Sequence, residues 1–208
     1  MDLYCERLAP GLLAEPLNAI TNVGFLIAAL WVWRAAGRRT DLRWLAALLA
    51  AIGFGSGLFH TFATPLAQLC DVIPIALLQL LYVYLYLHRV IGLRSRSAAA
   101  YLMLYGLALA IASRSGTSLN GSLAYAPAAL TLLVLGVVHY RLRRRREVLY
   151  AALAFLLSLL ARSVDLALCT QWPYGSHFLW HLFNAALLAT LLHAYQAATN
   201  DCRPTPLR

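Results

Sequence analysis

The chain has 208 residues, of which 62% are hydrophobic and only 12% are charged. A water-soluble domain of this size cannot bury so much apolar surface, because even a compact fold leaves much of its surface facing water. The composition therefore excludes a soluble globular protein and predicts that lipid surrounds most of the chain. The formal net charge of +9, carried entirely by arginine, also fits a nucleic-acid-binding protein until the positions of the arginines are considered.

Seven apolar stretches follow one another along the chain, each close to the length of about 20 residues that crosses a bilayer core. They are continuous and rich in leucine and alanine, whereas the strands of a membrane barrel alternate in polarity. The sequence thus predicts an all-α polytopic membrane protein of seven transmembrane helices, with residues 1–208 as a single domain. The stretches span approximately residues 17–33, 44–62, 69–88, 98–112, 123–140, 148–168 and 177–195.

The arginines gather in the first, third and fifth connections between these stretches. The second and sixth connections carry no charge, and the fourth carries only Arg114. Because basic connections mark the cytoplasmic side, this alternation predicts an N-terminus outside and a C-terminus, with Arg203 and Arg208, in the cytoplasm. The positive charge is then explained by topology and phospholipid contacts, so no nucleic-acid partner is expected. The arginines of the three basic connections are Arg34, Arg38, Arg39 and Arg43; Arg89, Arg94 and Arg96; and Arg141, Arg143, Arg144, Arg145 and Arg146.

Several polar residues fall at one level of the predicted membrane, on its outer side. The second stretch runs outward and ends with Ser56 and His60, four residues apart on one helical face. The third begins on the same side near Asp71, and the seventh begins there with His177 and His181. Polar residues are costly to insert into a membrane, so each of them is a candidate functional residue.

Three neutral imidazoles with a fourth position open for water are the ligand set of a catalytic zinc ion. The sequence predicts that His60, His177 and His181 bind Zn²⁺. Zinc lowers the pKa of its water to about 7, and a neighbouring carboxylate can accept the released proton. Asp71 is the candidate base, and Ser56 is the candidate to hydrogen-bond the ligands or the developing oxyanion.

Other interpretations of these polar residues are open at this stage. The histidines could serve interhelical hydrogen bonding or the axial ligation of a haem, although haem ligands usually come from facing helices near the middle of the bilayer. Arg162 and Asp165, three residues apart, are most simply read as an intrahelical ion pair that lowers the cost of insertion, although their position near the outer face also leaves open a supporting role beside the site.

The spacing resembles that of the alkaline ceramidases, seven-helix zinc hydrolases of the CREST superfamily. The matching pattern is Ser56-x-x-x-His60, then Asp71, then His177-x-x-x-His181. Further matches precede it. They are Tyr4-Cys5-Glu6, where the family has Trp-Cys-Glu, and Glu15-x-x-Asn18-x-x-x-Asn22.

The resemblance implies zinc-dependent hydrolysis of the amide bond of ceramide-like N-acyl lipids, giving a sphingoid base and a fatty acid. Asp71 would be the base, Ser56 would assist the oxyanion, and a membrane lipid would be the substrate. The family also has a calcium site, for which Glu6 and Glu15 are the remaining ligands, while Leu3 and Leu8 replace two others.

The resemblance also implies a disulfide between Cys5 and Cys169, with Cys70 as a competing partner on the same side of the membrane. Cys202, the fourth cysteine, lies close to the C-terminus. The short loops and the use of arginine alone favour a bacterial inner membrane.

Two alternatives to a ceramidase are a hydrolase of another lipid acyl bond and a zinc receptor similar to the adiponectin receptors. The receptors place their N-terminus in the cytosol, opposite to the arginine pattern here. A topology reporter fused to each end distinguishes these classes. We expect an external N-terminus and a cytoplasmic C-terminus, whereas a cytosolic N-terminus would favour the receptor.

Overall fold

The computed structural model describes residues 3–200, and this range contains eight α-helices, two short 3₁₀ helices and no strand. Arg203, Arg208 and Cys202 lie outside the described residues. The helices are α1 (Pro16–Thr21), α2 (Val23–Ala36), α3 (Thr40–Phe62), α4 (Pro65–Arg89), α5 (Ser95–Ala112), η1 (Ser113–Ser115), η2 (Ser122–Tyr125), α6 (Ala126–Arg143), α7 (Glu147–Leu168) and α8 (His177–Asn200).

Seven helical segments of the described chain are long and apolar enough to cross a membrane. The first combines α1 and α2, which meet at Asn22; the fourth and fifth include η1 and η2 as short extensions of α5 and α6. The predicted all-α fold of seven transmembrane helices is confirmed. The chain is an integral membrane protein with several spans.

Two helices begin four residues earlier than the apolar stretches indicated. The helix α3 begins at Thr40 rather than at residue 44, and α4 begins at Pro65 rather than at residue 69. The start of α4 has a local cause, because the Thr64 hydroxyl accepts a hydrogen bond from the Ala67 N–H at 3.2 Å and proline occupies the first helical position. Hydropathy locates the membrane-embedded part of a helix, whereas capping residues decide where it starts.

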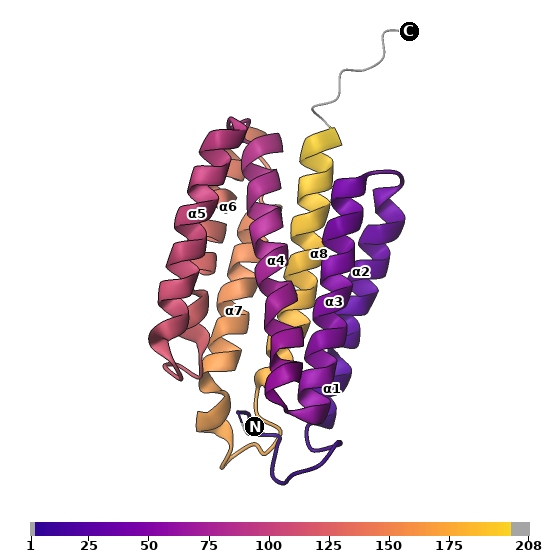
Figure 1. Ribbon diagram of the computed structural model, residues 1–208, viewed down its shortest axis with the longest axis vertical. Helices are drawn as coiled ribbons and strands as arrows, with labels where there is room; N and C mark the ends of the chain where they lie inside the picture. Colours follow the sequence, from indigo (N-terminus) through magenta and orange to yellow (C-terminus); the bar gives the residue numbers. More distant parts are fainter. Residues whose placement is uncertain (1–2, 201–208) are drawn as a thin grey trace, which may run out of the picture.

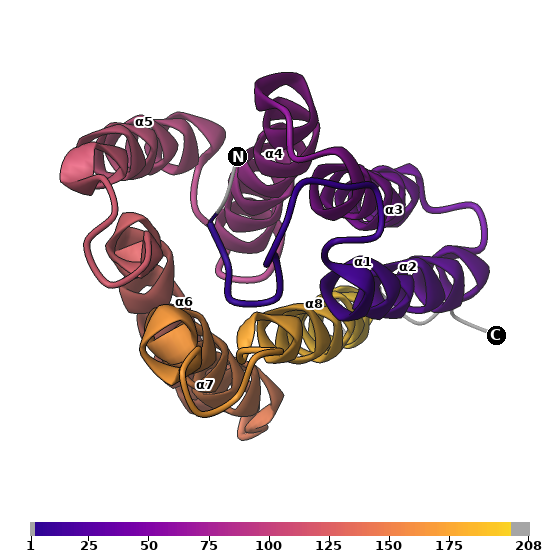
Figure 2. The ribbon, with the colours of Figure 1, turned by 90° about the horizontal axis from the view of Figure 1, so that it is seen from below.

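The seven spans stand side by side, as Figure 1 shows. Seen from the end in Figure 2, they follow one another around a ring in which α8 lies between α7 and the α1–α2 span. Residues 3–15 cross the interior of the ring at this end (Figure 2). This N-terminal segment therefore meets the end of α3 and the starts of α4 and α8.

A single carboxylate joins three helices at the opposite end of the bundle. Asp41, in the first turn of α3, accepts hydrogen bonds from Arg39 at 2.7 Å, from Arg89 of α4 at 2.7 Å and from Tyr195 of α8 at 2.6 Å. Charge-assisted bonds of this kind are about twice as strong as neutral ones. The far ends of α3, α4 and α8 are thus tied together, which limits how these helices can shift at the other end.

The helices α3 and α4 approach each other closely near Gly55. A Cβ atom added at Gly55 would overlap the backbone carbonyl of Cys70 in α4, so only glycine permits this approach. The residues that follow directly in each helix are Ser56 and Asp71. The close approach therefore sets these two side chains at the same level.

We predict that Gly55→Ala destabilises the protein by about 3 kcal/mol, because the added methyl group forces α3 away from α4. The matched control is Gly57→Ala on the same helix, where a Cβ would meet no atom within 4 Å. That change should be neutral or slightly stabilising, since alanine favours the helix. Thermal unfolding of the purified proteins in detergent measures the difference, and equal melting temperatures for the two variants would contradict the close approach.

Candidate metal centre

Three histidine side chains from two helices meet at the end of the bundle where the N-terminal segment lies. His60 comes from the last turn of α3, and His177 and His181 come from the first two turns of α8. One ring nitrogen of each lies within 4.8 Å of those of the other two. The ring centroids form a nearly equilateral triangle with sides of 5.2, 4.7 and 4.8 Å. The three histidines that the spacing singled out are therefore placed where they could hold one metal ion.

Hydrogen bonds fix the outer nitrogens of two of these rings. His60 Nδ1 lies 2.5 Å from Glu15 Oε2, and His181 Nδ1 lies 2.9 Å from the hydroxyl of Thr21. The Thr21 hydroxyl donates to the carbonyl of Leu17 at 2.8 Å, so it can only accept from His181. Both rings therefore carry their proton on Nδ1, which leaves the Nε2 lone pair free to bind a metal.

The third ring supplies an orphaned nitrogen. His177 Nδ1 is buried and has no hydrogen-bond partner among the described residues. A buried polar atom without a partner is costly unless a ligand satisfies it. The set of three buried, uncharged nitrogen donors fits Zn²⁺ in both number and chemical type.

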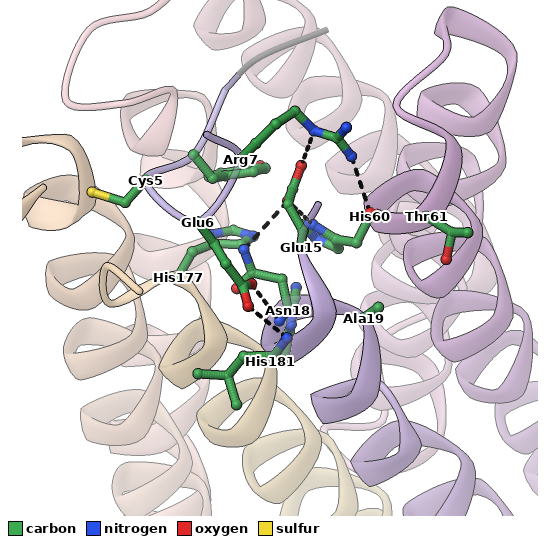
Figure 3. Close-up of polar contacts among 12 residues, drawn as sticks. Cys5, Glu6, Arg7, Glu15, Asn18, Ala19, His60, Thr61, His177 and His181 are labelled. Carbon is green, nitrogen blue, oxygen red and sulfur yellow. Dashed lines mark hydrogen bonds and ion pairs between the residues drawn. The ribbon is translucent and has the colours of Figure 1, made fainter. Parts of the chain in front are cut away.

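Glu15 is ionised beside this centre, in the N-terminal segment. Burial alone would raise the pKa of its carboxyl, but the hydrogen bonds from His60 and Arg7 and the charge of Arg7 outweigh burial and hold the pKa below its ordinary value. A carboxylate that accepts the outer N–H of a metal-binding histidine fixes the tautomer and the orientation of the ring. Figure 3 shows Glu15 between Arg7 and His60.

Asp165 positions His177, a role that the sequence did not reveal. Its Oδ1 atom accepts hydrogen bonds from the backbone N–H groups of Ser176 at 2.7 Å and His177 at 2.9 Å, and its Oδ2 atom accepts from the Cys5 N–H at 3.0 Å. The carboxylate of α7 thus stabilises the start of α8, whose first N–H groups lack partners within the helix. No local pattern could have predicted this, since the partners lie at least 11 residues away in sequence.

The expected ion pair between Arg162 and Asp165 is wrong, because Asp165 is occupied by these backbone groups. Arg162 instead donates to the hydroxyl of Tyr4 at 2.9 Å, and its guanidinium lies 5.3 Å from the ring centre of Trp180. Burial raises the pKa of Tyr4 to about 12, so its hydroxyl stays protonated. The Tyr4 ring stacks on His177 with centroids 3.6 Å apart. Arg162 is therefore linked to the metal centre through one aromatic ring.

The predicted disulfide joins Cys5 to Cys169, and Cys70 is free and exposed. The bond attaches the N-terminal segment to the residue that follows α7. Because Cys5 also donates to Asp165, the segment is held at this point by a covalent bond and a hydrogen bond.

The candidate base lies next to the candidate oxyanion residue. Ser56, which is buried in α3, lies close enough to Asp71 of α4 for its hydroxyl to interact with the carboxyl group. The charge of Asp71 is close enough to interact with His60 and with Arg162. The four residues therefore belong to one electrostatic cluster, although they come from three helices.

Glu6 and Glu15 do not fit a calcium site. The two oxygens of Glu6 accept the backbone N–H groups of Leu17 and Asn18 at 2.6 and 2.8 Å, and the two oxygens of Glu15 face Arg7 and His60. Calcium takes six to eight oxygen ligands. Here a guanidinium lies against the carboxylate that the resemblance assigns to the ion.

A mainly apolar cavity lies between the helices, and its lining includes Trp180, the residue before His181. Its wall along α8 runs from Trp180, the neighbour of His181, to Leu191. These eleven steps correspond to about 16 Å at the helical rise. Phe25, which also lines the cavity, contacts the ring of His181 edge-on with a centroid distance of 6.3 Å. The apolar lining therefore comes close to the histidines at Trp180 and Phe25.

We predict that Asp165→Asn lowers both stability and bound zinc, because the amide offers one acceptor oxygen where the carboxylate offers two. The cost should be about 2 kcal/mol for the N–H groups left without a partner. Thermal unfolding and zinc analysis of the purified protein measure the two effects. Ser163→Ala on the same helix is the control, and a melting temperature and zinc content equal to wild type in Asp165→Asn would contradict the assigned role.

Comparisons with known proteins agree with this geometry. A search of curated proteins finds no match, but the model of the family described as Ceramidase matches residues 4–203, nearly the whole chain. The matched region contains the three histidines, Ser56, Asp71 and the N-terminal segment that covers them. The chain belongs to the Ceramidase family.

Proposed function

We propose that this protein is a zinc-dependent amidase that hydrolyses the amide bond of ceramide or a related N-acyl lipid. The observation that carries the proposal is the buried triangle of His60, His177 and His181, which lies next to the Phe25 and Trp180 side chains that line an apolar cavity. Membership of the Ceramidase family supports amide hydrolysis as the reaction. The substrate is a membrane lipid, and the whole of residues 1–208 acts as one domain.

Zinc bound by the three histidines would act as a Lewis acid toward the amide carbonyl and lower the pKa of water. Asp71 accepts a proton from the attacking water as the new C–O bond forms, and then passes this proton to the amide nitrogen as the C–N bond breaks. The products are a fatty acid and an amine, and atoms balance with one water consumed.

Ser56 has a different role from a simple oxyanion donor in the resting protein. Its single hydroxyl proton can serve either Asp71, which it neighbours, or the oxyanion, but not both at once. We propose that Ser56 orients the Asp71 carboxylate before the reaction. Its hydroxyl becomes available to the oxyanion once Asp71 takes up the proton from water.

The cavity explains why a lipid amide would be the substrate. An acyl chain lying along α8 would replace the empty apolar space, and burial of each CH₂ group is worth about 0.8 kcal/mol. The amide group at the end of that chain would then lie beside the histidines. We propose a multi-pass location in a bacterial inner membrane, where substrate and both products remain lipid-soluble.

Hydrolysis of a panel of N-acyl lipids by purified protein, with zinc analysis, tests the proposal. The panel should include ceramides of several acyl lengths, N-acylethanolamines and an ester lipid. We expect about one zinc per chain and release of fatty acid from ceramide by the wild type, with both lost in His177→Ala. In Asp71→Asn, zinc should remain while turnover falls about 10²- to 10⁴-fold, the usual contribution of a general base.

Cys70→Ser is the matched control, because Cys70 is the exposed neighbour of Asp71 on the same helix. It should keep wild-type turnover. Cleavage of the ester lipid alone would assign the chain to a different acyl hydrolase. Bound zinc with no turnover of any lipid would favour a receptor. A protein without zinc would overturn the assumption, shared by all these alternatives, that the three histidines bind zinc.

A further inference from the structure

Arg7 is a buried cation in the N-terminal segment, only 9% exposed, and all of its guanidinium nitrogens have partners. Its Nε atom donates to Glu15 Oε1 at 2.5 Å, and its Nη1 atom donates to the carbonyl of Gly11 at 3.3 Å. Its Nη2 atom donates to the backbone carbonyl of His60 at 3.1 Å. Figure 3 shows the side chain reaching from the segment to the end of α3.

The contacts of Arg7 converge on one of the three histidines. Arg7 and His60 bind opposite oxygens of the Glu15 carboxylate, so Arg7 holds the group that fixes the His60 ring. Arg7 also binds the His60 carbonyl, which lies in the last turn of α3 and lacks a partner within the helix. A single side chain thus restrains both the ring and the backbone of this residue.

The positive charge of Arg7 balances the negative charge of the buried Glu15 carboxylate. Glu6 and Glu15 are 7% and 2% exposed, and burial of an unpaired carboxylate is strongly unfavourable. Backbone N–H groups at the start of α1 satisfy Glu6. Among the described residues, Arg7 is the one permanently charged group within ion-pair distance of Glu15, because His60 is uncharged when it binds a metal.

We propose that Arg7 is a built-in cation that does the work of a bound calcium ion, so that the metal centre assembles without calcium. The inference rests on the proposed zinc centre. It follows from the position of the guanidinium against Glu15, and from the apolar side chains of Leu3 and Leu8 on either side, which offer no oxygen ligands. Leu8 points to the surface and is 80% exposed. Arg7 is a positioning residue that acts through Glu15 and His60.

Zinc binding, measured separately from hydrolysis, tests this proposal. Wild-type protein prepared free of calcium is titrated with zinc in a metal buffer, without calcium and with about 1 mM calcium, near the weak end of protein calcium sites. We expect the zinc affinity and the visible spectrum of the cobalt-substituted protein to stay the same under both conditions. A zinc affinity that rises tenfold with calcium would overturn the proposal, even if the protein hydrolyses no lipid.

Variants at Arg7 provide the second measurement. Arg7→Ala should weaken zinc binding about 10- to 100-fold, as is usual when a group that orients a metal ligand is removed, and shift the cobalt spectrum. Free guanidinium ion at millimolar concentration should restore part of the affinity, whereas Arg7→Lys should fall between alanine and wild type. The matched control is Arg114→Gln in the exposed connection at the same end of the bundle, which should bind zinc as wild type does.

The two measurements keep the proposal testable if Arg7→Ala fails to fold, because the calcium titration needs only wild-type protein. Wild-type zinc affinity in Arg7→Ala would overturn the proposal. Failure of the zinc centre itself would appear differently, as the absence of zinc in the wild type and in Arg114→Gln.

Discussion

The Asp165 carboxylate is the interaction on which the arrangement of this end of the protein depends. It comes from α7, yet it accepts hydrogen bonds from the start of α8 and from the N-terminal segment. Buried N–H groups need partners, and one carboxylate satisfies three of them here. As a result, His177 is fixed relative to Cys5, and the disulfide to Cys169 holds the same junction covalently. The N-terminal segment can therefore act as part of the metal centre.

Around the three histidines, the charged side chains lie at increasing distance from the candidate metal position. The three histidines are buried and uncharged when they bind a metal, and a carboxylate, Glu15, and a hydroxyl, Thr21, hold two of the rings. Permanent positive charges lie one step further out, at Arg7 and Arg162. Such an arrangement lets a membrane protein bury charges, because each is paired or lies against aromatic rings.

One end of the bundle holds the helices together, and the other end carries the candidate metal site. At one end Asp41 ties α3, α4 and α8 together, while the other end holds the histidines from α3 and α8. Helices fixed at one end have little freedom to slide, so the distances between His60 and the pair on α8 are maintained. The apolar cavity lies between the helices, and its lining residue Phe25 contacts the ring of His181. In the proposed function, the acyl chain of the lipid lies in this cavity and its amide group lies beside the histidines.

The sequence by itself determined the number of membrane spans and singled out the three histidines that could hold a metal ion. Both are local signals: apolar length reports a membrane helix, and a polar residue inside such a helix stands out because insertion is costly. The spacing of His177 and His181 places them on one helical face whatever the surrounding fold. The same reasoning failed for Asp165, whose nearest charged neighbour in sequence is not its partner in space.

Only the tertiary structure decided which groups meet around these residues. It placed Arg7 against Glu15 and Tyr4 against His177, and it directed Asp165 at the start of α8. These contacts join segments up to about 170 residues apart, and the hydrogen-bonding needs of buried groups select them only after the helices have packed. The sequence therefore identifies the candidate metal ligands, while packing determines which partners orient them.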